Sequence, residues 1–363
     1  MTSKRSIGRW CAAALAMAAL VFSAATAFAA DEPRFDGVTL RVATYGGPWK
    51  DGLTELIGKE MEKLGAKVEF DTGPPSIHLA KLIAARGKAP PFDLTEVGDP
   101  DVPFFLQAGV LQKFDVSKLP NKADLVTPIR DDYLVPDWAF DDGVTYNADK
   151  FRELGLPKPT RYRDLLNPKL KGRVGVPTIE NNLTRGLLAV LGFAIDSGGG
   201  DDNIAPGLKT MKELGATQFY SGAPAEATAM VNGDIWAGFM NAGWAVRLRR
   251  AGHPWASFAN LKVGDKTGFF ERGYMGLAKG TPNAAAAHYF VNRYISASIQ
   301  LELGKRLGSV PVNKEALKEI AKDPMLSELM SLTTEEIGNM RTVDFEKIDL
   351  SKWHEEWSNI MLR

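Results

Sequence analysis

Strand-like segments alternate with helical patterns in the first third of the chain, and this alternation constrains the fold more than any other feature. Residues 39–43 and 67–70 are apolar and β-branched like strands, and an amphipathic helical pattern lies between them at 49–64. A third strand pattern, at 92–97, follows a second helical pattern that ends near Ala85. Strands separated by helices form a largely parallel sheet with helices on its faces. The sequence therefore predicts an α/β fold.

A second region with the same alternation lies in the middle of the chain. Residues 172–177 and 234–239 have strand patterns, and 182–195 is a long apolar helical pattern. Between the two regions, residues 137–146 are extended in pattern and suit a connecting strand. A length of 363 residues, at roughly 150 residues per domain, also favours two units. We therefore expect two α/β lobes that meet at the connecting strand.

The first 30 residues have the pattern of a secretory signal peptide. Three basic residues precede an apolar stretch at 11–28, and Ala-Phe-Ala at 27–29 has the small-x-small form of a cleavage site. The one cysteine, Cys11, lies in this stretch, so a mature chain that begins near residue 31 has none. No second apolar stretch approaches the roughly 20 residues that span a bilayer. We expect a periplasmic protein without disulfides.

Charge and motifs exclude several classes of function. The chain has 44 basic and 44 acidic residues, and removal of the leader gives a net charge of about −3, with no basic run to neutralise nucleic-acid phosphates. The four histidines are scattered, and there is no HExxH, GxSxG, GxxxxGK[ST] or CxxC motif. We expect no nucleic acid, metal or cofactor, and no enzyme. An acid–base pair assembled from distant positions is the enzymatic alternative.

Ligand-binding candidates follow the predicted strand ends, because parallel α/β sheets bind ligands at the carboxyl ends of their strands. Aromatic rings there can stack on a ligand, and polar side chains can orient it. The glycines at 46 and 47 leave room for a ligand to approach the backbone. The candidate residues are Tyr45, Trp49, Asp99, Glu180, Asn182, Ser221, Asn241, Trp244, Arg272 and Tyr274.

Six stretches in a fixed order carry a family resemblance. They are residues 40–49 (LRVATYGGPW), 81–94 (KLIAARGKAPPFDL), 109–112 (GVLQ), 143–147 (GVTYN), 168–174 (PKLKGRV) and 311–314 (PVNK). Together they resemble the periplasmic solute-binding proteins of ABC importers, particularly the spermidine- and putrescine-binding branch. The resemblance implies a two-lobed periplasmic-binding-protein-like fold of type II, with a ligand cleft between the lobes and hinge strands. It also implies a small-molecule ligand and an inner-membrane ABC permease as partners of a monomer.

The resemblance also implies how the chain divides. After a signal peptide at 1–30, lobe 1 would consist of residues 31–139 and 272–312, and lobe 2 of residues 140–271 and 313–363. Carried over position by position, Tyr45, Asp99, Glu180, Asn241 and the segment 272–274 fall near ligand-contacting positions of the polyamine binders.

One departure from that branch concerns the charge of the cleft. Polyamine binders have an acidic residue near the second crossover, whereas here Arg272 stands in that neighbourhood and Glu271 is the nearest carboxylate. An arginine favours a carboxylate ligand over a diamine. We expect a polyamine-like amine first, with Glu180 and Asp99 as the partners of its cationic nitrogen. The alternatives are a carboxylate, a zwitterion or another organic solute. If the ligand is an anion, Arg272 is expected to be its main partner. An enzyme on the same fold and a sensor for a membrane receptor are the other classes.

Overall fold

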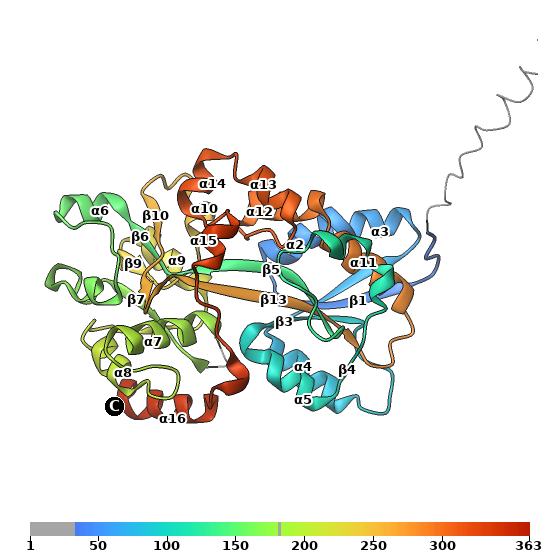
Figure 1. Cartoon of the computed structure of the whole chain (residues 1–363), viewed down its shortest axis with the longest axis horizontal. Helices are drawn as coiled ribbons and strands as arrows, with labels where there is room; N and C mark the ends of the chain where they lie inside the picture. Colours follow the sequence, from blue (N-terminus) through green and yellow to red (C-terminus); the bar gives the residue numbers. More distant parts are fainter. Residues whose placement is uncertain (1–32, 181–182) are drawn as a thin grey trace, which may run out of the picture.

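The structure is a computed structural model that describes residues 33–180 and 183–363. The predicted signal peptide at 1–30, with Cys11, and the candidate Asn182 lie outside the described residues. Figure 1 shows two lobes side by side, each built on its own sheet. We call the lobe that begins with residue 33 lobe 1 and the other lobe 2.

The sheet of lobe 1 has six strands in the order β2-β1-β3-β13-β4, with β5 paired to β13 beside this path. Strand β1 is parallel to β2 and β3, and β13 is antiparallel to β3, β4 and β5. The strands are β1 (Thr39–Thr44), β2 (Lys67–Thr72), β3 (Leu94–Gly98), β4 (Leu111–Gln112), β5 (Leu134–Asp142) and β13 (Phe269–Ala278). The strand predictions at 39–43, 67–70 and 92–97 are confirmed.

A continuous helix after β1 covers this sheet. It runs through α2 (Pro48–Leu53), a π-helical turn and α3 (Lys59–Lys63), which confirms the helix predicted at 49–64. Trp49, Leu53, Ile57 and Met61 recur every fourth residue and are all buried, so one stripe of the helix packs on the core. The other helices of this lobe are α4 (Pro75–Ala84), α5 (Val102–Ala108), α11 (Ala284–Tyr294) and α12 (Ala297–Leu307).

The sheet of lobe 2 has five strands in the order β10-β6-β9-β7-β8. Strand β7 is parallel to β8 and β9, while β6 is antiparallel to β9 and β10. The strands are β6 (Val144–Asn147), β7 (Val174–Pro177), β8 (Phe219–Tyr220), β9 (Ala237–Gly238) and β10 (Ala256–Ala259), and a hairpin adds β11 (Lys262–Val263) and β12 (Lys266–Thr267). Strand β9 is shorter than the predicted strand at 234–239.

Helices surround this second sheet. They are α6 (Ala148–Glu153), α7 (Thr184–Asp196), α8 (Ala205–Lys212), α9 (Ala223–Asn232), α10 (Ala242–Arg250) and α16 (Leu350–Met361). The long apolar helix predicted at 182–195 corresponds to α7, which is buried from Arg185 to Ala194. Short 3-10 turns lie at Asp99–Asp101, Val116–Lys118, Pro120–Asp124, Tyr162–Leu166, Pro168–Leu170 and Phe345–Lys347.

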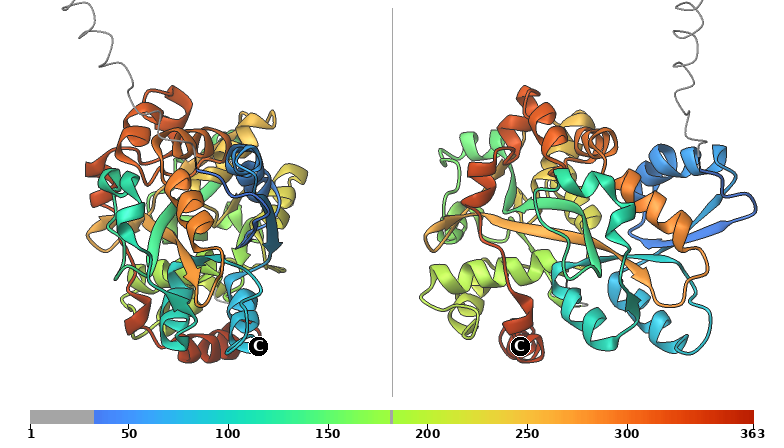
Figure 2. Two further views of the ribbon diagram at one scale, coloured as in Figure 1. Left: turned by 90° about the vertical axis from the view of Figure 1, so that its right-hand side faces the viewer. Right: turned by 45° about the vertical axis from the view of Figure 1, so that its right-hand side comes forward.

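Two long strands, β5 and β13, connect the lobes. They pair in an antiparallel ladder from Phe269 opposite Asp142 to Gly276 opposite Leu134, and Figures 1 and 2 show them running together from one lobe to the other. The ladder shifts register after Gly273. A Cβ at Gly273 would lie 1.8 Å from the ring of Trp138, so only glycine permits this close approach. The connecting strand predicted at 137–146 overlaps β5, and β13 is the second strand that connects the lobes.

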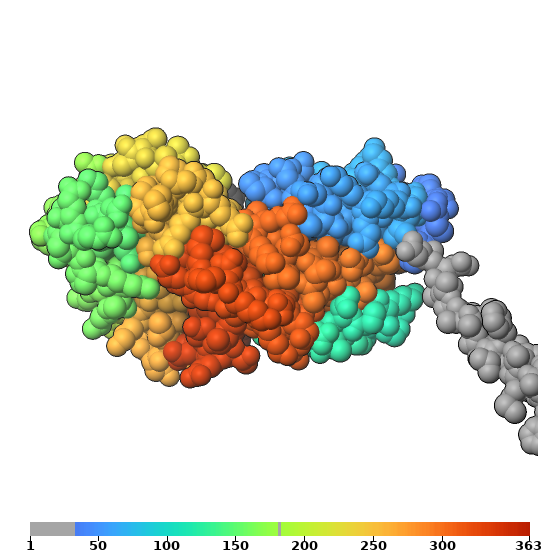
Figure 3. Space-filling model, turned by 90° about the horizontal axis from the view of Figure 1, so that it is seen from above, coloured from blue at the N-terminus to red at the C-terminus, as the bar shows by residue number. Residues whose placement is uncertain are grey.

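The C-terminal helices pack across the junction. Helices α13 (Lys314–Ile320) and α14 (Pro324–Leu329) belong to the same hydrophobic core as β1 and the first residues of α10, and Figure 3 shows this part of the chain over the junction of the lobes. After α15 (Thr334–Gly338), the chain reaches α16, which buries Trp353 and Trp357 in the core of lobe 2. The exact division of the chain between the lobes stays a prediction.

Candidate ligand-binding cleft

A cavity of about 500 Å³ lies between the lobes and is lined from both sides and by the connecting strands. Its walls come from the turn after β1, from β5 and β13, from the start of α7 and from α9 and α10. The lining residues are Tyr45, Gly46, Gly47, Pro48, Trp49, Trp138, Phe140, Leu183, Thr184, Arg185, Pro224, Asn241, Trp244, Arg247 and Glu271.

The wall of lobe 1 is aromatic. The ring of Trp138 lies 5.9 Å from that of Tyr45 and 6.4 Å from that of Trp49, centroid to centroid, and Phe140 lies 6.0 Å from Trp49. The turn before α2 requires glycine, because Gly47 has a φ of 64°. This wall offers flat apolar faces on which the body of an organic ligand can stack.

A buried carboxylate fixes Trp49 in this wall. The indole Nε1 of Trp49 donates to both carboxylate oxygens of Glu96, at 3.0 and 3.2 Å, and the hydroxyl of Tyr294 donates to Glu96 at 2.8 Å. The hydroxyl of Thr44 also donates to this carboxylate. Burial raises the pKa of Glu96, while these donors oppose the rise. The orientation of Trp49 therefore depends on a residue beneath the cavity surface.

The wall of lobe 2 carries a cation on an aromatic ring. Trp244 and Arg247 are three residues apart on α10, and the guanidinium carbon of Arg247 lies 4.1 Å from the centroid of the indole. Nε of Arg247 donates to the carbonyl of Gly243 at 2.9 Å. Burial, and then the charge of Arg185, lower the pKa of Arg247 to about 10. Arg247 therefore stays charged at neutral pH.

Arg247 has no carboxylate within ion-pair distance in the part of the chain that the structure describes. The other arginine of the cavity, Arg185, differs: it contacts Glu226 at 2.9 Å, and both side chains are buried. Burial raises the pKa of Glu226 to about 7, and the charge of Arg185 opposes that rise. Arg185 is balanced inside lobe 2, whereas Arg247 presents an unbalanced positive charge to the cavity.

Two further polar groups lie in the cavity wall. Glu271, on β13, is buried; burial raises the pKa of its carboxyl, and the neighbouring side chains of Asp142 and Thr184 oppose that rise. Asn241 caps the start of α10 in sequence, yet its side chain makes no capping bond, and its Oδ1 is buried without a donor among the described residues. An unpaired buried acceptor is costly, so Asn241 is suited to accept a hydrogen bond from a ligand.

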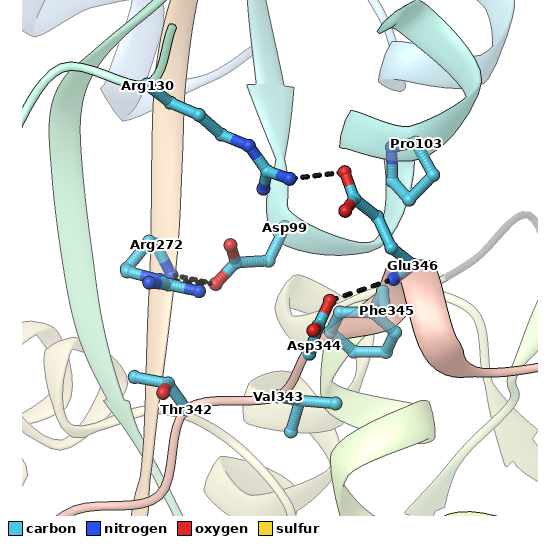
Figure 4. Close-up of a pocket in the computed structure, with 9 residues that line it drawn as sticks. All are labelled: Asp99, Pro103, Arg130, Arg272, Thr342, Val343, Asp344, Phe345 and Glu346. Atoms are coloured by element: carbon cyan, nitrogen blue, oxygen red, sulfur yellow. Dashed lines mark hydrogen bonds and ion pairs between the residues drawn. The ribbon is translucent and has the colours of Figure 1, made fainter. Parts of the chain in front are cut away.

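Arg272 and Asp99 belong to a different pocket. Neighbouring residues of a strand point to opposite faces, so Glu271 lines the cavity and Arg272 does not. Figure 4 shows the second pocket, of about 300 Å³, where Nε of Arg272 meets Oδ2 of Asp99 at 3.0 Å and Arg130 meets Glu346. Burial raises the pKa of Asp99 to about 6, against the effect of Arg272. The charge of Arg272 is already balanced there.

The structure therefore separates the candidates predicted from the sequence. Tyr45, Trp49, Asn241 and Trp244 come together around the cavity. Five others are not among the lining residues: Asp99 and Arg272 line the second pocket, Tyr274 is buried in the core of lobe 1, and Glu180 and Ser221 are exposed. Asn182 lies outside the described residues.

Sequence reasoning did not select Trp138, Phe140, Arg185 and Arg247. The three-residue spacing from Trp244 to Arg247 was a usable signal, because residues so spaced share one helix face. Trp138 and Phe140 alternate along a strand and therefore share a face as well. No sequence signal distinguishes Arg185 as paired and Arg247 as unpaired, since that depends on Glu226 from another helix.

The described residues contain neither a cluster of metal-ligating side chains nor a membrane-spanning helix. Between residues 33 and 363, apart from 181 and 182, no group of three or more histidine, cysteine or acidic side chains could hold a metal ion. Over the same described residues, no helix is both long enough and apolar enough to cross a bilayer.

Solved structures of the same fold include complexes with different ligands. The chain is similar to MotA from A. tumefaciens B6 in complex with glucopine (TM-score 0.71, 18% identity, 89% of this chain and 99% of that one). It is also similar to AgtB from A. tumefaciens R10 in complex with agropinic acid (0.70, 21%, 91% and 100%). A third is a putative spermidine/putrescine ABC transporter protein from Listeria monocytogenes (0.70, 20%, 90% and 99%). These likenesses show the fold.

The family follows from a match in sequence. No curated protein matches the chain. A family model described as bacterial extracellular solute-binding protein matches residues 58–328, which is well over half of the chain and includes every strand of both sheets except β1, both connecting strands and most of the cavity lining. The two lobes, the paired crossing strands and the cavity between them agree with this match. The chain belongs to the bacterial extracellular solute-binding protein family.

Proposed function

We propose that this protein is the periplasmic receptor of an ABC importer, and that its cleft encloses a small organic molecule with a carboxylate group. The carboxylate would bind Arg247, and the body of the ligand would stack between Trp244 and the aromatic wall of Trp49 and Trp138. The observation that carries the proposal is the unbalanced guanidinium of Arg247 in the cavity wall.

The charges of the cavity favour this ligand class over a diamine. Arg185 is balanced by Glu226, and burial raises the pKa of Glu271, which favours the neutral form of that carboxyl. Arg247 therefore has an incomplete set of partners, and a charge-assisted bond from a guanidinium to a carboxylate is about twice as strong as a neutral hydrogen bond. A diamine carries two positive charges, and the positive charge of Arg247 would repel them. The polyamine expected first from the sequence, with Asp99 and Glu180 as its partners, has less support, since neither residue lines this cavity.

The solved structural neighbours are consistent with a carboxylate ligand, but they do not select it over an amine. AgtB is in complex with agropinic acid, which is an acid by name, whereas the Listeria protein has a putative assignment to the amines spermidine and putrescine. These two proteins are similar to this chain to about the same degree. The fold alone therefore does not select the ligand, and we infer its class from the residues of this cleft.

Capture would follow from the two lobes and two connecting strands. A ligand that contacts Trp49 in lobe 1 and Arg247 in lobe 2 makes all of its contacts only when the lobes are closed, so it favours the closed form. No bond is made or broken. We propose that the closed monomer delivers the ligand to a membrane permease after an N-terminal signal peptide has directed its export.

The test is a thermal-shift screen of the mature chain, residues 31–363. Amino acids, ω-amino acids, dicarboxylates, putrescine and spermidine are each added. A ligand at 100 times its dissociation constant stabilises the fold by about 2.7 kcal/mol, which moves the midpoint visibly. We expect shifts with one or more carboxylates and none with the two amines. Shifts with the amines alone would refute the carboxylate assignment.

A further inference from the structure

The second pocket, of about 300 Å³, lies on the side of the connecting strands that faces away from the cleft. Glu271 of β13 and its partner Phe140 of β5 line the cleft, whereas the next residue of β13, Arg272, lines the second pocket. Successive residues of a strand point to opposite faces, so the paired strands separate the two cavities. Residues of lobe 1 and of the segment before α16 form the other walls, as Figure 4 shows.

An ion pair crosses this pocket from one lobe to the other. The guanidinium of Arg130, in lobe 1, donates to the carboxylate of Glu346, and Figure 4 shows the two side chains directed toward each other. Helix α5 of lobe 1 also contacts the turn Phe345–Lys347, which carries Glu346. The lobes therefore touch at this pocket as well as through the connecting strands.

Both ends of the ion pair are fixed to the cores of their lobes. The backbone N–H of Arg130 donates to the carbonyl of Leu134 at 2.9 Å, and Leu134 is fully buried at the start of β5. On the other side, Phe345 is buried in the core of lobe 2, and the side chain of Asp344 accepts a hydrogen bond from the N–H of Glu346 at 3.3 Å. A movement of one lobe relative to the other therefore changes the distance between the two charges.

We propose that the ion pair of Arg130 and Glu346 stabilises the open form of the protein and opposes closure of the cleft. We call this pair the interlobe latch. The connecting strands are the pivot between the lobes, and the cleft and the latch lie on opposite sides of that pivot. A rotation that narrows the cleft must therefore widen the second pocket and separate the two charges. This inference rests on the capture by lobe closure proposed above, but not on the charge of the ligand.

The latch affects the affinity for any ligand that requires the closed form. The measured dissociation constant equals that of the closed form divided by the fraction of the protein that is closed before binding. The two side chains are 31% and 46% exposed, and ion pairs this accessible to water stabilise a protein only modestly. Loss of the latch should therefore tighten binding by about two- to fivefold. An intact latch keeps the free receptor open for ligand entry, with a small loss of affinity.

The experiment is calorimetric titration of the mature chain with each amino acid, ω-amino acid, dicarboxylate and polyamine of the thermal-shift panel. We expect Arg130→Gln and Glu346→Gln each to bind the ligand about two- to fivefold more tightly than the unaltered chain. The double variant Arg130→Glu with Glu346→Arg reverses the ion pair and should restore the original affinity. Arg341→Gln is the matched control, since Arg341 pairs with Asp201 next to α7 of lobe 2 and these side chains are also 31% and 46% exposed.

A distance measurement reports the same equilibrium without a ligand. The chain from residue 31 to residue 363 has no cysteine, so spin labels can be attached at Asp51→Cys and Ala225→Cys. Both positions are exposed, on α2 and α9, and each lies within two residues of the cleft lining. Double electron–electron resonance then gives the distribution of distances across the cleft. We expect Glu346→Gln to move part of this distribution to shorter distances, and the reversed pair to move it back.

The outcomes separate the interlobe latch from the proposed function. Tighter binding of putrescine or spermidine by both single variants, and binding of no carboxylate, would support the latch and overturn the carboxylate assignment. Weaker or unchanged binding of a carboxylate by both variants would overturn the latch and leave the carboxylate receptor standing. Equally tightened binding by Arg341→Gln would assign the effect to net charge and also overturn the latch. If no member of the panel binds, the proposed function fails, and an unchanged distance distribution in Glu346→Gln would overturn the latch as well.

Discussion

The guanidinium carbon of Arg247 lies 4.1 Å from the centroid of the indole ring of Trp244, one helical turn away, and both side chains line the cleft between the lobes. The stacking holds a charge and an aromatic face in fixed relation on α10. An extended charged side chain loses considerable freedom when it binds a ligand, and stacking lowers that loss because the guanidinium is already ordered. This arrangement suits a ligand in which a carboxylate is joined to a flat or apolar body.

Replacement of Arg247 by glutamine should weaken the cognate carboxylate by about 10- to 100-fold, since a hydrogen bond to a charged group is worth about 1.5–3 kcal/mol. Calorimetric titration measures the change. Arg250→Gln is the matched control, because Arg250 is exposed on the same helix and is not part of the lining. Equal losses in the two variants would show that net charge, rather than contact, is responsible.

Trp244→Ala should weaken the ligand at least tenfold, corresponding to about 1.4 kcal/mol, without unfolding the protein. The side chain is only half-buried and lies at the cavity surface, so its removal costs little core packing. The control is Trp236→Ala, which removes an indole that contacts Lys150 and Arg173 outside the cavity. Unchanged affinity in Trp244→Ala would remove this residue from the site.

Glu96→Gln should destabilise the protein by about 1–3 kcal/mol and also weaken the ligand. The amide offers one acceptor where the carboxylate receives donors from Thr44, Trp49 and Tyr294, so at least one buried donor loses its partner and Trp49 is held less firmly. Urea unfolding gives the first quantity and titration the second. Glu62→Gln, an exposed change on α3, should affect neither; a stable Glu96→Gln protein with normal binding would be contrary to this role.

Gly273→Ala should destabilise the connecting strands by about 1–3 kcal/mol or more, because the new Cβ would overlap the ring of Trp138. Since Trp138 is part of the aromatic wall, ligand affinity should fall as well. Gly338→Ala is the control: a Cβ there meets nothing within 4 Å, so its unfolding free energy should stay the same or rise slightly. Equal stability of both variants would show that the close approach is not needed.

The unligated protein should be more stable near pH 5 than near pH 8. Burial raises the pKa of Asp141 and of Glu226 to about 7, whereas both carboxyls titrate near 4 when unfolded. Between these values the folded state binds more protons than the unfolded state, so its stability falls as pH rises through the folded pKa. The melting temperature measured across this range should therefore decrease. A constant or rising value would place these two carboxyls in a more polar setting than their burial indicates.

Local patterns predicted the elements that end at the cleft. The apolar strands before Tyr45 and Asp99, and the four-residue spacing of Trp49, Leu53 and Ile57, are readable because each element carries its own period. These features were sufficient to expect two α/β lobes and to select Tyr45, Trp49, Asn241 and Trp244, which line the cavity between them.

The face of the sheet toward which a strand residue points could not be predicted from the sequence. Arg272 and Glu271 are adjacent, and only the pairing of β13 with β5 decides which of them meets the cavity. A shift of one residue exchanges the two faces of a strand, so the sequence could not separate them. The balance of Arg185 by Glu226, and the isolation of Arg247, likewise arise from contacts between helices that are far apart in the chain.

A crystal structure of the mature chain with its tightest-binding carboxylate tests the central claim most directly. We predict the ligand in the cavity between the lobes, with a carboxylate oxygen about 2.7–2.9 Å from a guanidinium nitrogen of Arg247 and the ligand body against Trp244. A ligand whose carboxylate does not touch Arg247, or one seated in the second pocket beside Arg272 and Asp99, would contradict the assignment of this cleft.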